Sequence, residues 1–164
     1  MSKHNATTQN SAREVKFAAD RMLGRMVKWL RIMGHDVIYG RHLSGYGLIR
    51  AARKENRLIL TRDQSLRMKQ PPDFLFIESD RYIEQVRQVI RACHLRPSAR
   101  PFTRCLECNS VLQPRSKDLV EKIVPPYVFS TQEMFSWCLE CGRVYWPATH
   151  HQRMLEGLRK IEAG

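Results

Sequence analysis

The stretch VKFAADRMLGRMVKWLRIMGHDVIYG, residues 15–40, carries a complete strand–helix–strand pattern. An apolar run at 15–19 predicts a buried strand, a helical spacing of apolar residues follows over 22–33, and 36–39 predicts a second strand. Gly34 suits the end of the helix, because glycine readily adopts the backbone conformation found there. A helix between two strands favours a parallel sheet in an α/β fold.

The same alternation continues beyond this stretch. The further predicted elements are a helix at 48–55, a strand at 58–61 with a short turn or helix after it, a strand at 74–77 and a helix at about 80–94. Asp80 is a suitable N-cap for the last of these helices. The β-α-β-α-β order therefore predicts a mostly parallel sheet flanked by helices.

The chain divides into parts of different composition. Two prolines within Arg96-Pro-Ser-Ala-Arg-Pro101 interrupt the periodicity and predict a linker. We expect a disordered tail at 1–13, an α/β domain at 14–96, a small metal-binding unit at 97–149 and a C-terminal helix at 150–164. Of the 164 residues, 43% are apolar, which is enough for a folded core.

Positive charge is concentrated in the first domain. The net charge is +12, and residues 1–100 hold 20 Lys and Arg against 9 Asp and Glu, whereas residues 101–164 hold 8 against 7. A polyanion would therefore bind the first domain, and nucleic acid is the favoured partner. An anionic membrane surface is the lesser alternative, and a basic charge that serves only solubility is the plainest one.

Nothing in the sequence predicts membrane insertion or secretion. No apolar run approaches the roughly 20 residues of a membrane span, and the polar N-terminus has no apolar centre like that of a signal peptide. We therefore expect a cytoplasmic protein, in which thiols stay reduced and paired cysteines bind metal.

Two cysteine pairs predict a zinc ribbon. Cys105-Leu-Glu-Cys108 and Cys138-Leu-Glu-Cys141 each supply two sulfurs from one tight turn, and 29 residues between the pairs leave room for a β-hairpin. Asn109 and Gly142, which follow the pairs, tolerate the positive φ that such turns need. Two disulfides and a rubredoxin-like iron site are the alternatives. Four thiolates form a closed site, so we expect this zinc to stabilise the fold and to do no chemistry.

Three other potential ligands are less informative. Cys93 lies on the last predicted helix of the first domain, where a buried thiol is expected rather than a nucleophile. His150 and His151 would be able to replace a cysteine ligand, but with four cysteines present we do not expect them to.

Aspartates follow two of the predicted strands. Asp20 closes the first strand and Asp63 follows the third, so in a parallel sheet both would emerge at the carboxyl edge. Two converging carboxylates would suit Mg²⁺ or Mn²⁺, ions that activate water and stabilise the charge of phosphodiester cleavage. The alternative is that Asp20 is only a helix N-cap and Asp63 only a turn residue.

A basic side is predicted on the helix after Asp20. Its apolar residues gather on one side, whereas Arg21, Arg25, Lys28 and Arg31 lie on the opposite side. Together with Arg62, these cations would position phosphates beside the carboxylates. A solvated basic face without function is the alternative.

These segments together resemble the Mut7-C RNase family, a PIN-like nuclease domain followed by a zinc ribbon. The matching residues lie at 20–24, 29–36 and 57–63 in the first domain, and at 101–109, 138–146, His150 and 153–154 in the ribbon. The resemblance implies a PIN-like fold and a divalent-metal-dependent attack of water on RNA. Asp20 and Asp63 match the family motif, and Asp36 matches a further family position that would supply a third catalytic carboxylate.

One departure from the family pattern bears on catalysis. The family carries acidic residues at the start of the helix before the third strand, but here no acid occurs from Gly40 through Lys54. Three hypotheses follow: a Mg²⁺- or Mn²⁺-dependent endoribonuclease, a non-catalytic RNA-binding protein with a degenerate site, and a zinc-ribbon adaptor for protein partners. The sequence does not indicate an oligomeric state.

Overall fold

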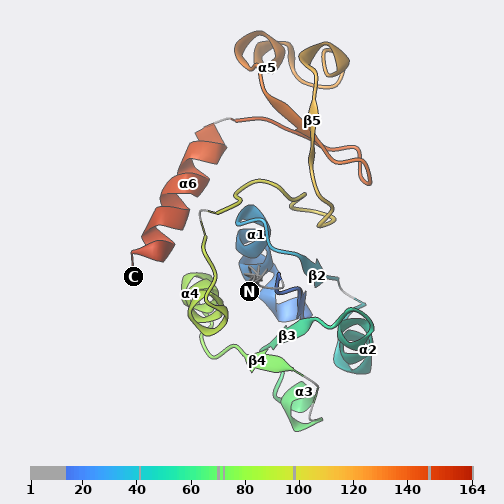
Figure 1. The fold of residues 1–164 in the computed structure, drawn as a ribbon, viewed down its shortest axis with the longest axis vertical. Coiled ribbons are helices and arrows are strands. Elements are labelled where there is room, and N and C mark those ends of the chain that lie inside the picture. Colours follow the sequence, from blue (N-terminus) through green and yellow to red (C-terminus); the bar gives the residue numbers. More distant parts are fainter. Residues whose placement is uncertain are drawn as a thin grey trace, which may run out of the picture.

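A computed structural model describes residues 14–40, 42–69, 71, 73–97, 99–147 and 149–163. The tail expected at 1–13 lies outside these described residues. Figure 1 shows a helix-flanked sheet, with a smaller unit at the opposite end of the molecule from α3.

The larger unit is built on a four-stranded parallel sheet. Its strands are β1 (Phe17–Ala19), β2 (Val37–Tyr39), β3 (Leu58–Thr61) and β4 (Phe74–Phe76), in the order β2-β1-β3-β4. All four fall within the predicted strands, and the predicted parallel α/β sheet is confirmed. The carboxyl ends of β1, β3 and β4 therefore lie side by side at one edge of the sheet.

Helices cover both faces of this sheet. The short helix η1 (Arg21–Leu23), then α1 (Gly24–Ile32) and α4 (Tyr82–Cys93) pack on one face with Phe17 and Ala19. On the other face, α2 (Gly45–Glu55) and α3 (Gln64–Met68) pack with Ala18. Successive residues of a strand point to opposite faces, so the three-residue strand β1 contributes to two cores.

One helix end differs from the prediction and another confirms it. The N-cap of α4 is Arg81, not Asp80, because the helix begins only at Tyr82. Gly34 follows the end of α1 with a φ of +88°, as its predicted role requires. Cys93 ends α4 and is half-buried against the core, and burial raises the pKa of its thiol.

The smaller unit contains an antiparallel sheet of β5 (Gln113–Arg115), β6 (Phe135–Trp137) and β7 (Val144–Tyr145). The interval between the cysteine pairs is more than a hairpin. Its strands β5 and β6 do pair, but η2 (Lys117–Leu119) and α5 (Pro126–Thr131) lie between them, and α5 packs on a small core of Val120, Val124 and Phe135.

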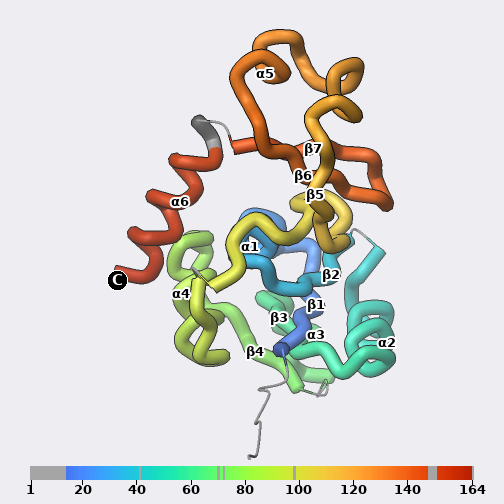
Figure 2. The backbone as a smooth tube through the Cα atoms, turned by 45° about the horizontal axis from the view of Figure 1, so that its top comes forward, coloured from blue at the N-terminus to red at the C-terminus, as the bar shows by residue number. Residues whose placement is uncertain are grey.

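The C-terminal helix α6 (Thr149–Glu162) returns to the larger unit and packs against α4 (Figure 2). Leu158 and Ile161 are buried in the same core as α1. A Cβ at Gly157 would collide with the ring of Trp29, so glycine permits the close approach of α6 to α1. No helix in the described part of the chain is long and apolar enough to cross a bilayer.

Candidate functional site

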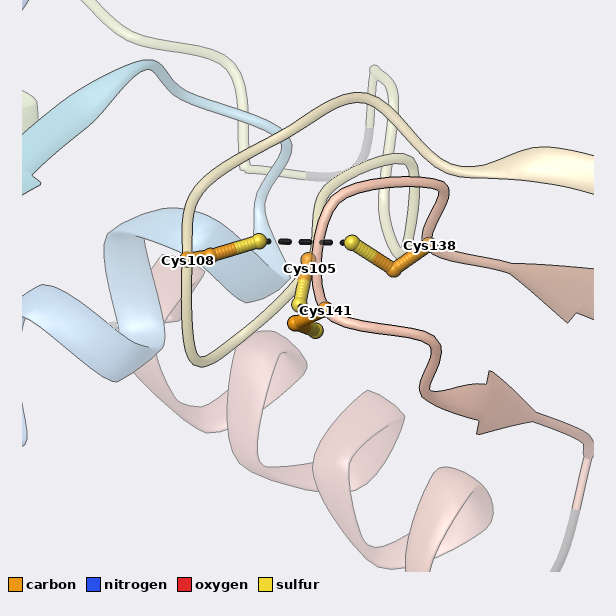
Figure 3. Close-up of side chains that lie close together, drawn as sticks. All are labelled: Cys105, Cys108, Cys138 and Cys141. Carbon is orange, nitrogen blue, oxygen red and sulfur yellow. Dashed lines mark hydrogen bonds between the residues drawn. The ribbon is translucent and has the colours of Figure 1, made fainter.

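The four predicted cysteine ligands converge (Figure 3). Their Sγ atoms all lie within 4.8 Å of one another, with Cys105–Cys141 at 3.6 Å and Cys108–Cys138 at 3.3 Å. A disulfide needs about 2.05 Å, whereas four sulfurs about 2.3 Å from a tetrahedral zinc lie about 3.8 Å apart. The cluster therefore fits a metal ion such as zinc.

The backbone builds both cysteine turns in the same way. The N–H of Asn109 donates to the carbonyl of Cys105, and the N–H of Gly142 donates to the carbonyl of Cys138, at 3.1 and 2.9 Å. Asn109 and Gly142 have φ values of +74° and +72°, which confirms the predicted need for residues that tolerate this conformation.

The surroundings of Cys105 favour its thiolate form. Burial alone would raise the pKa of this thiol, but the N–H of Cys108 and the hydroxyl of Tyr145 lower it to about 6. Burial and this hydrogen bond raise the pKa of Tyr145, which stays a donor. A thiolate is the form that binds metal. The ring of His151 lies against Phe102, with centroids 3.8 Å apart, and the side chain of His150 lies outside the described residues.

A second candidate site lies at the carboxyl edge of the parallel sheet. Asp20 is buried and accepts three hydrogen bonds: Oδ1 from the N–H of Met22 (2.7 Å), Oδ2 from the hydroxyl of Thr61 (2.6 Å) and the N–H of Arg62 (2.8 Å). It caps η1, as the structural alternative predicted. A carboxylate oxygen can accept two hydrogen bonds, and Oδ1 of Asp20 accepts only the one from Met22, so it keeps one acceptor position free.

The hydroxyl of Thr61 connects Asp63 to Asp20. The Thr61 hydroxyl donates to Asp20 and accepts the N–H of Asp63 at 3.0 Å. Asp63 is half-buried and caps α3 by accepting the N–H of Ser65 at 2.8 Å through Oδ1. Hydrogen bonds from Ser65 lower the pKa of Asp63 and keep it ionised at neutral pH.

Two acidic residues at this edge were not singled out from the sequence as ligands. Glu78 and Asp80 follow β4, the neighbour of β3, and both are exposed. The signal was an acid directly after an apolar strand, as at Asp20 and Asp63. Within the described residues, the cysteines form the only group of three or more potential metal ligands that converge closely.

Asp36 does not belong to this edge, which corrects its expected catalytic role. It precedes β2, so it lies at the amino edge of the sheet, about 13 Å along the strands from Asp20. It binds Arg57 at 2.6 Å and the Asn109 amide at 2.8 Å, with Arg104 at 3.7 Å. Burial would raise the pKa of Asp36, but these bonds, above all from Arg57, lower it.

Arg31 is also corrected. Its side chain is buried, and it donates to the carbonyls of Val37, Leu106 and Glu107 at 2.8–3.2 Å. It therefore holds the first cysteine turn against β2 and is not open to a phosphate. The helical pattern placed Arg31 on a basic side because it could not show that the ribbon covers the last turn of α1.

The other predicted cations remain accessible. Arg21, Arg25 and Lys28, here called the basic face, are exposed, and Arg62 is half-buried. The guanidinium of Arg25 lies 4.3 Å from the centre of the Tyr82 ring and lines a cavity of about 400 Å³ beside Arg81. Met22, whose N–H binds Asp20, lines the same cavity, so Arg25 lies close to this edge, and Arg21 directly follows Asp20 in the chain.

Comparison of this chain with known proteins identifies its family. The chain matches the family described as the Mut7-C RNAse domain over residues 15–158, nearly its whole length, which confirms the resemblance seen in the sequence. No curated protein and no solved structure matches it. The chain belongs to the Mut7-C RNAse domain family.

Proposed function

We propose that this protein is a metal-dependent ribonuclease of PIN-like type that cleaves RNA phosphodiester bonds at the carboxyl edge of its parallel sheet. The family is described as a ribonuclease domain. The observation that carries the proposal is the Thr61 hydroxyl, which joins the Asp20 carboxylate to the backbone N–H of Asp63 at the usual place for sites in open α/β folds.

The carboxylates at this edge suit a hard divalent ion. Asp20 keeps a free acceptor position on Oδ1. Asp63 is only half-buried, and the hydrogen bonds to its carboxylate come from its own helix cap. Mg²⁺ and Mn²⁺ prefer oxygen ligands of this kind. When bound, such an ion supplies activation of water and stabilisation of the charge that develops on the phosphate.

Glu78 is the best placed additional ligand. The sheet register sets Asp20 level with Thr61 and Phe76, and the N–H of Ile77 bonds to the Thr61 carbonyl at 2.7 Å. Two residues beyond that level come Asp63 and Glu78. Both follow the last residue of their strands by two positions, and Asp20 directly follows β1, so Asp20, Asp63 and Glu78 emerge at the same edge of the sheet.

The cations beside this edge would position the RNA. The basic face and Arg62 offer positive charge that attracts phosphates and releases counterions on binding. Tyr82 holds the guanidinium of Arg25 by a cation–π contact, which reduces the entropy lost when a phosphate binds.

The second candidate is an RNA-binding protein without catalysis. Its support is that no third carboxylate converges on Asp20 and Asp63 in the described residues, whereas the basic face is intact. It predicts RNA binding that does not depend on Mg²⁺ or Mn²⁺.

A cleavage assay separates the two candidates. End-labelled single-stranded RNA is incubated with the zinc-loaded protein while Mg²⁺ or Mn²⁺ is titrated. We expect cleavage only with added Mg²⁺ or Mn²⁺ and a weaker metal response in Glu78→Gln. The matched control is Asp73→Asn, an exposed aspartate before β4 at the opposite edge. RNA that binds but stays intact at every metal concentration would favour the second candidate.

A further inference from the structure

A pocket that the zinc site and the sheet edge do not use lies between the ribbon and the start of α6. It has a volume of about 270 Å³. Its lining includes the rings Phe102, Tyr145, Trp146 and His151, together with Ser136. Only Tyr145 among these contacts a cysteine of the metal cluster. Leu106, Leu112, Pro147 and Met154 complete its apolar wall, so the pocket combines flat aromatic rings with aliphatic side chains.

The backbone at Phe102 is shaped to hold one of these walls. Phe102 has a φ of +59°, a backbone conformation that residues other than glycine rarely adopt. Its N–H donates to the Ile32 carbonyl at 2.7 Å, and its ring lies against His151 with an angle of 31° between the planes. Such conformations concentrate at ligand-binding positions.

The polar groups of the pocket are mostly neutral. Ser136 and Trp146 line it, and within the described residues neither side chain makes a hydrogen bond. Arg104 also lines it, but its guanidinium already binds the carbonyls of Gly34 and Asn109. The pocket thus offers stacking surfaces and neutral donors, which suit a flat heterocycle with acceptor atoms.

We propose that this pocket binds an unstacked base of single-stranded RNA. The inference rests on the proposed function for its ligand class. The distribution of charge supports it: residues 1–100 carry 20 Lys and Arg against 9 acids and would attract phosphates, whereas residues 101–164 carry 8 against 7. The ribbon is then suited to contact bases, and proteins read single-stranded RNA by stacking bases on aromatic rings.

Binding to RNA by full-length, zinc-loaded variants tests this assignment. All carry Asp63→Asn to limit cleavage, and fluorescence anisotropy reports affinity for a labelled single strand and for the same sequence as a blunt duplex. Phe102→Leu removes the ring but keeps apolar bulk, and should weaken single-strand binding by about fivefold or more. Phe102→Tyr should retain affinity, and duplex binding should not change.

Two further variants keep the test independent of folding. Ser136→Leu fills the pocket without removing a core side chain and should weaken single-strand binding similarly. Tyr127→Leu, at a ring that is 78% exposed on the same ribbon and outside the pocket, is the matched control and should bind like the parent. The proposal is overturned if the folded Phe102→Leu, Ser136→Leu and parent proteins bind RNA with equal affinity. It is also overturned if the protein binds no RNA, or if the pocket binds only an aromatic side chain of a peptide.

The outcome is distinguishable from failure of the proposed function. If the protein with Asp63 intact cleaves RNA but Phe102→Leu does not change RNA affinity, the ribonuclease proposal stands and the base-pocket proposal is wrong. If Phe102→Leu weakens RNA binding but no cleavage is seen, the base-pocket proposal stands and the ribonuclease proposal is wrong.

Discussion

The two edges of the parallel sheet use aspartate in opposite ways. At the amino edge, Asp36 is buried among Arg57, Arg104 and Asn109, and the first cysteine turn covers it. At the carboxyl edge, Asp63 is half-buried, the hydrogen bonds to its carboxylate come from its own helix cap, and exposed cations lie nearby. The residue type is the same, so the partners that cover each edge decide whether a carboxylate stabilises the fold or is available to a ligand.

The difference begins with the cysteine turn. Asn109 donates to Asp36 and accepts the N–H of Val37 at 2.9 Å on the outer strand β2, while Arg31 binds the turn from the other side. The metal cluster and the amino edge therefore form one connected structure. Changes at this edge should act on stability, and changes at the carboxyl edge should act on RNA.

Loss of the metal ligand should have the largest effect. Structural zinc contributes about 10–16 kcal/mol of apparent binding free energy in small zinc domains. Cys138→Ser should unfold the ribbon and, because the first turn is bonded to β2, also lower the melting temperature of the sheet. Elemental analysis should find about one zinc in the parent chain. Thermal unfolding of a Cys93→Ser control should change much less, and iron or no metal in the parent would contradict the assignment.

Asp36→Asn should have the next largest effect. It removes the closest carboxylate from the buried guanidinium of Arg57, which keeps Glu55 at 2.7 Å, so we expect a loss of about 3 kcal/mol, the lower end for a broken buried ion pair. Denaturant unfolding measures the loss, with the exposed Asp73→Asn as the matched control. A loss as small as in the control would show that the amino-edge network does not stabilise the fold.

The same carboxylate predicts a pH dependence. The pKa of Asp36 is lower in the folded chain than in the unfolded one, so its stabilisation is present above the unfolded pKa of about 3.9 and is lost as pH falls through the folded pKa. Unfolding free energy should therefore fall below about pH 4 in the parent and fall less steeply in Asp36→Asn. Parallel curves for the two proteins would contradict this.

Much of this contrast was accessible from the sequence, and part of it was not. Strand and helix periods predicted the parallel sheet, and the cysteine spacing predicted the cluster. The burial of Arg31 and Asp36 was not predictable, because both contact residues more than 70 positions away, in the ribbon. A helical pattern describes only one helix. It cannot show which other segment covers a polar face.

Arginines on one helix sharpen the comparison further. Arg31→Met should cost about 3 kcal/mol, because it leaves carbonyls of the cysteine turn and of β2 without a charged donor. Arg25→Met, on the exposed side of the same helix, should leave stability nearly unchanged and weaken RNA binding. Denaturant unfolding and an RNA-binding assay on both variants test the contrast, which fails if the two substitutions act alike.

The smallest expected effect concerns the basic face. Replacing Arg21, Arg25 and Lys28 with Gln removes three charges, and should flatten the slope of log affinity against log salt by about 2 for single-stranded RNA. The matched control replaces Arg50, Arg53 and Lys54, which are exposed on α2. An unchanged slope, or an equal change in the control, would mean that the basic face does not contact phosphates.

The most direct test of the contrast between the two edges measures cleavage and unfolding together in Asp63→Asn and Asp36→Asn. Asparagine can still cap α3, so Asp63→Asn should keep its melting temperature. We predict that Asp63→Asn abolishes Mg²⁺- or Mn²⁺-dependent cleavage, while Asp36→Asn lowers the melting temperature and keeps the cleavage rate per folded molecule. Cleavage that survives Asp63→Asn, or that is abolished in folded Asp36→Asn, would contradict the assignment of chemistry to the carboxyl edge.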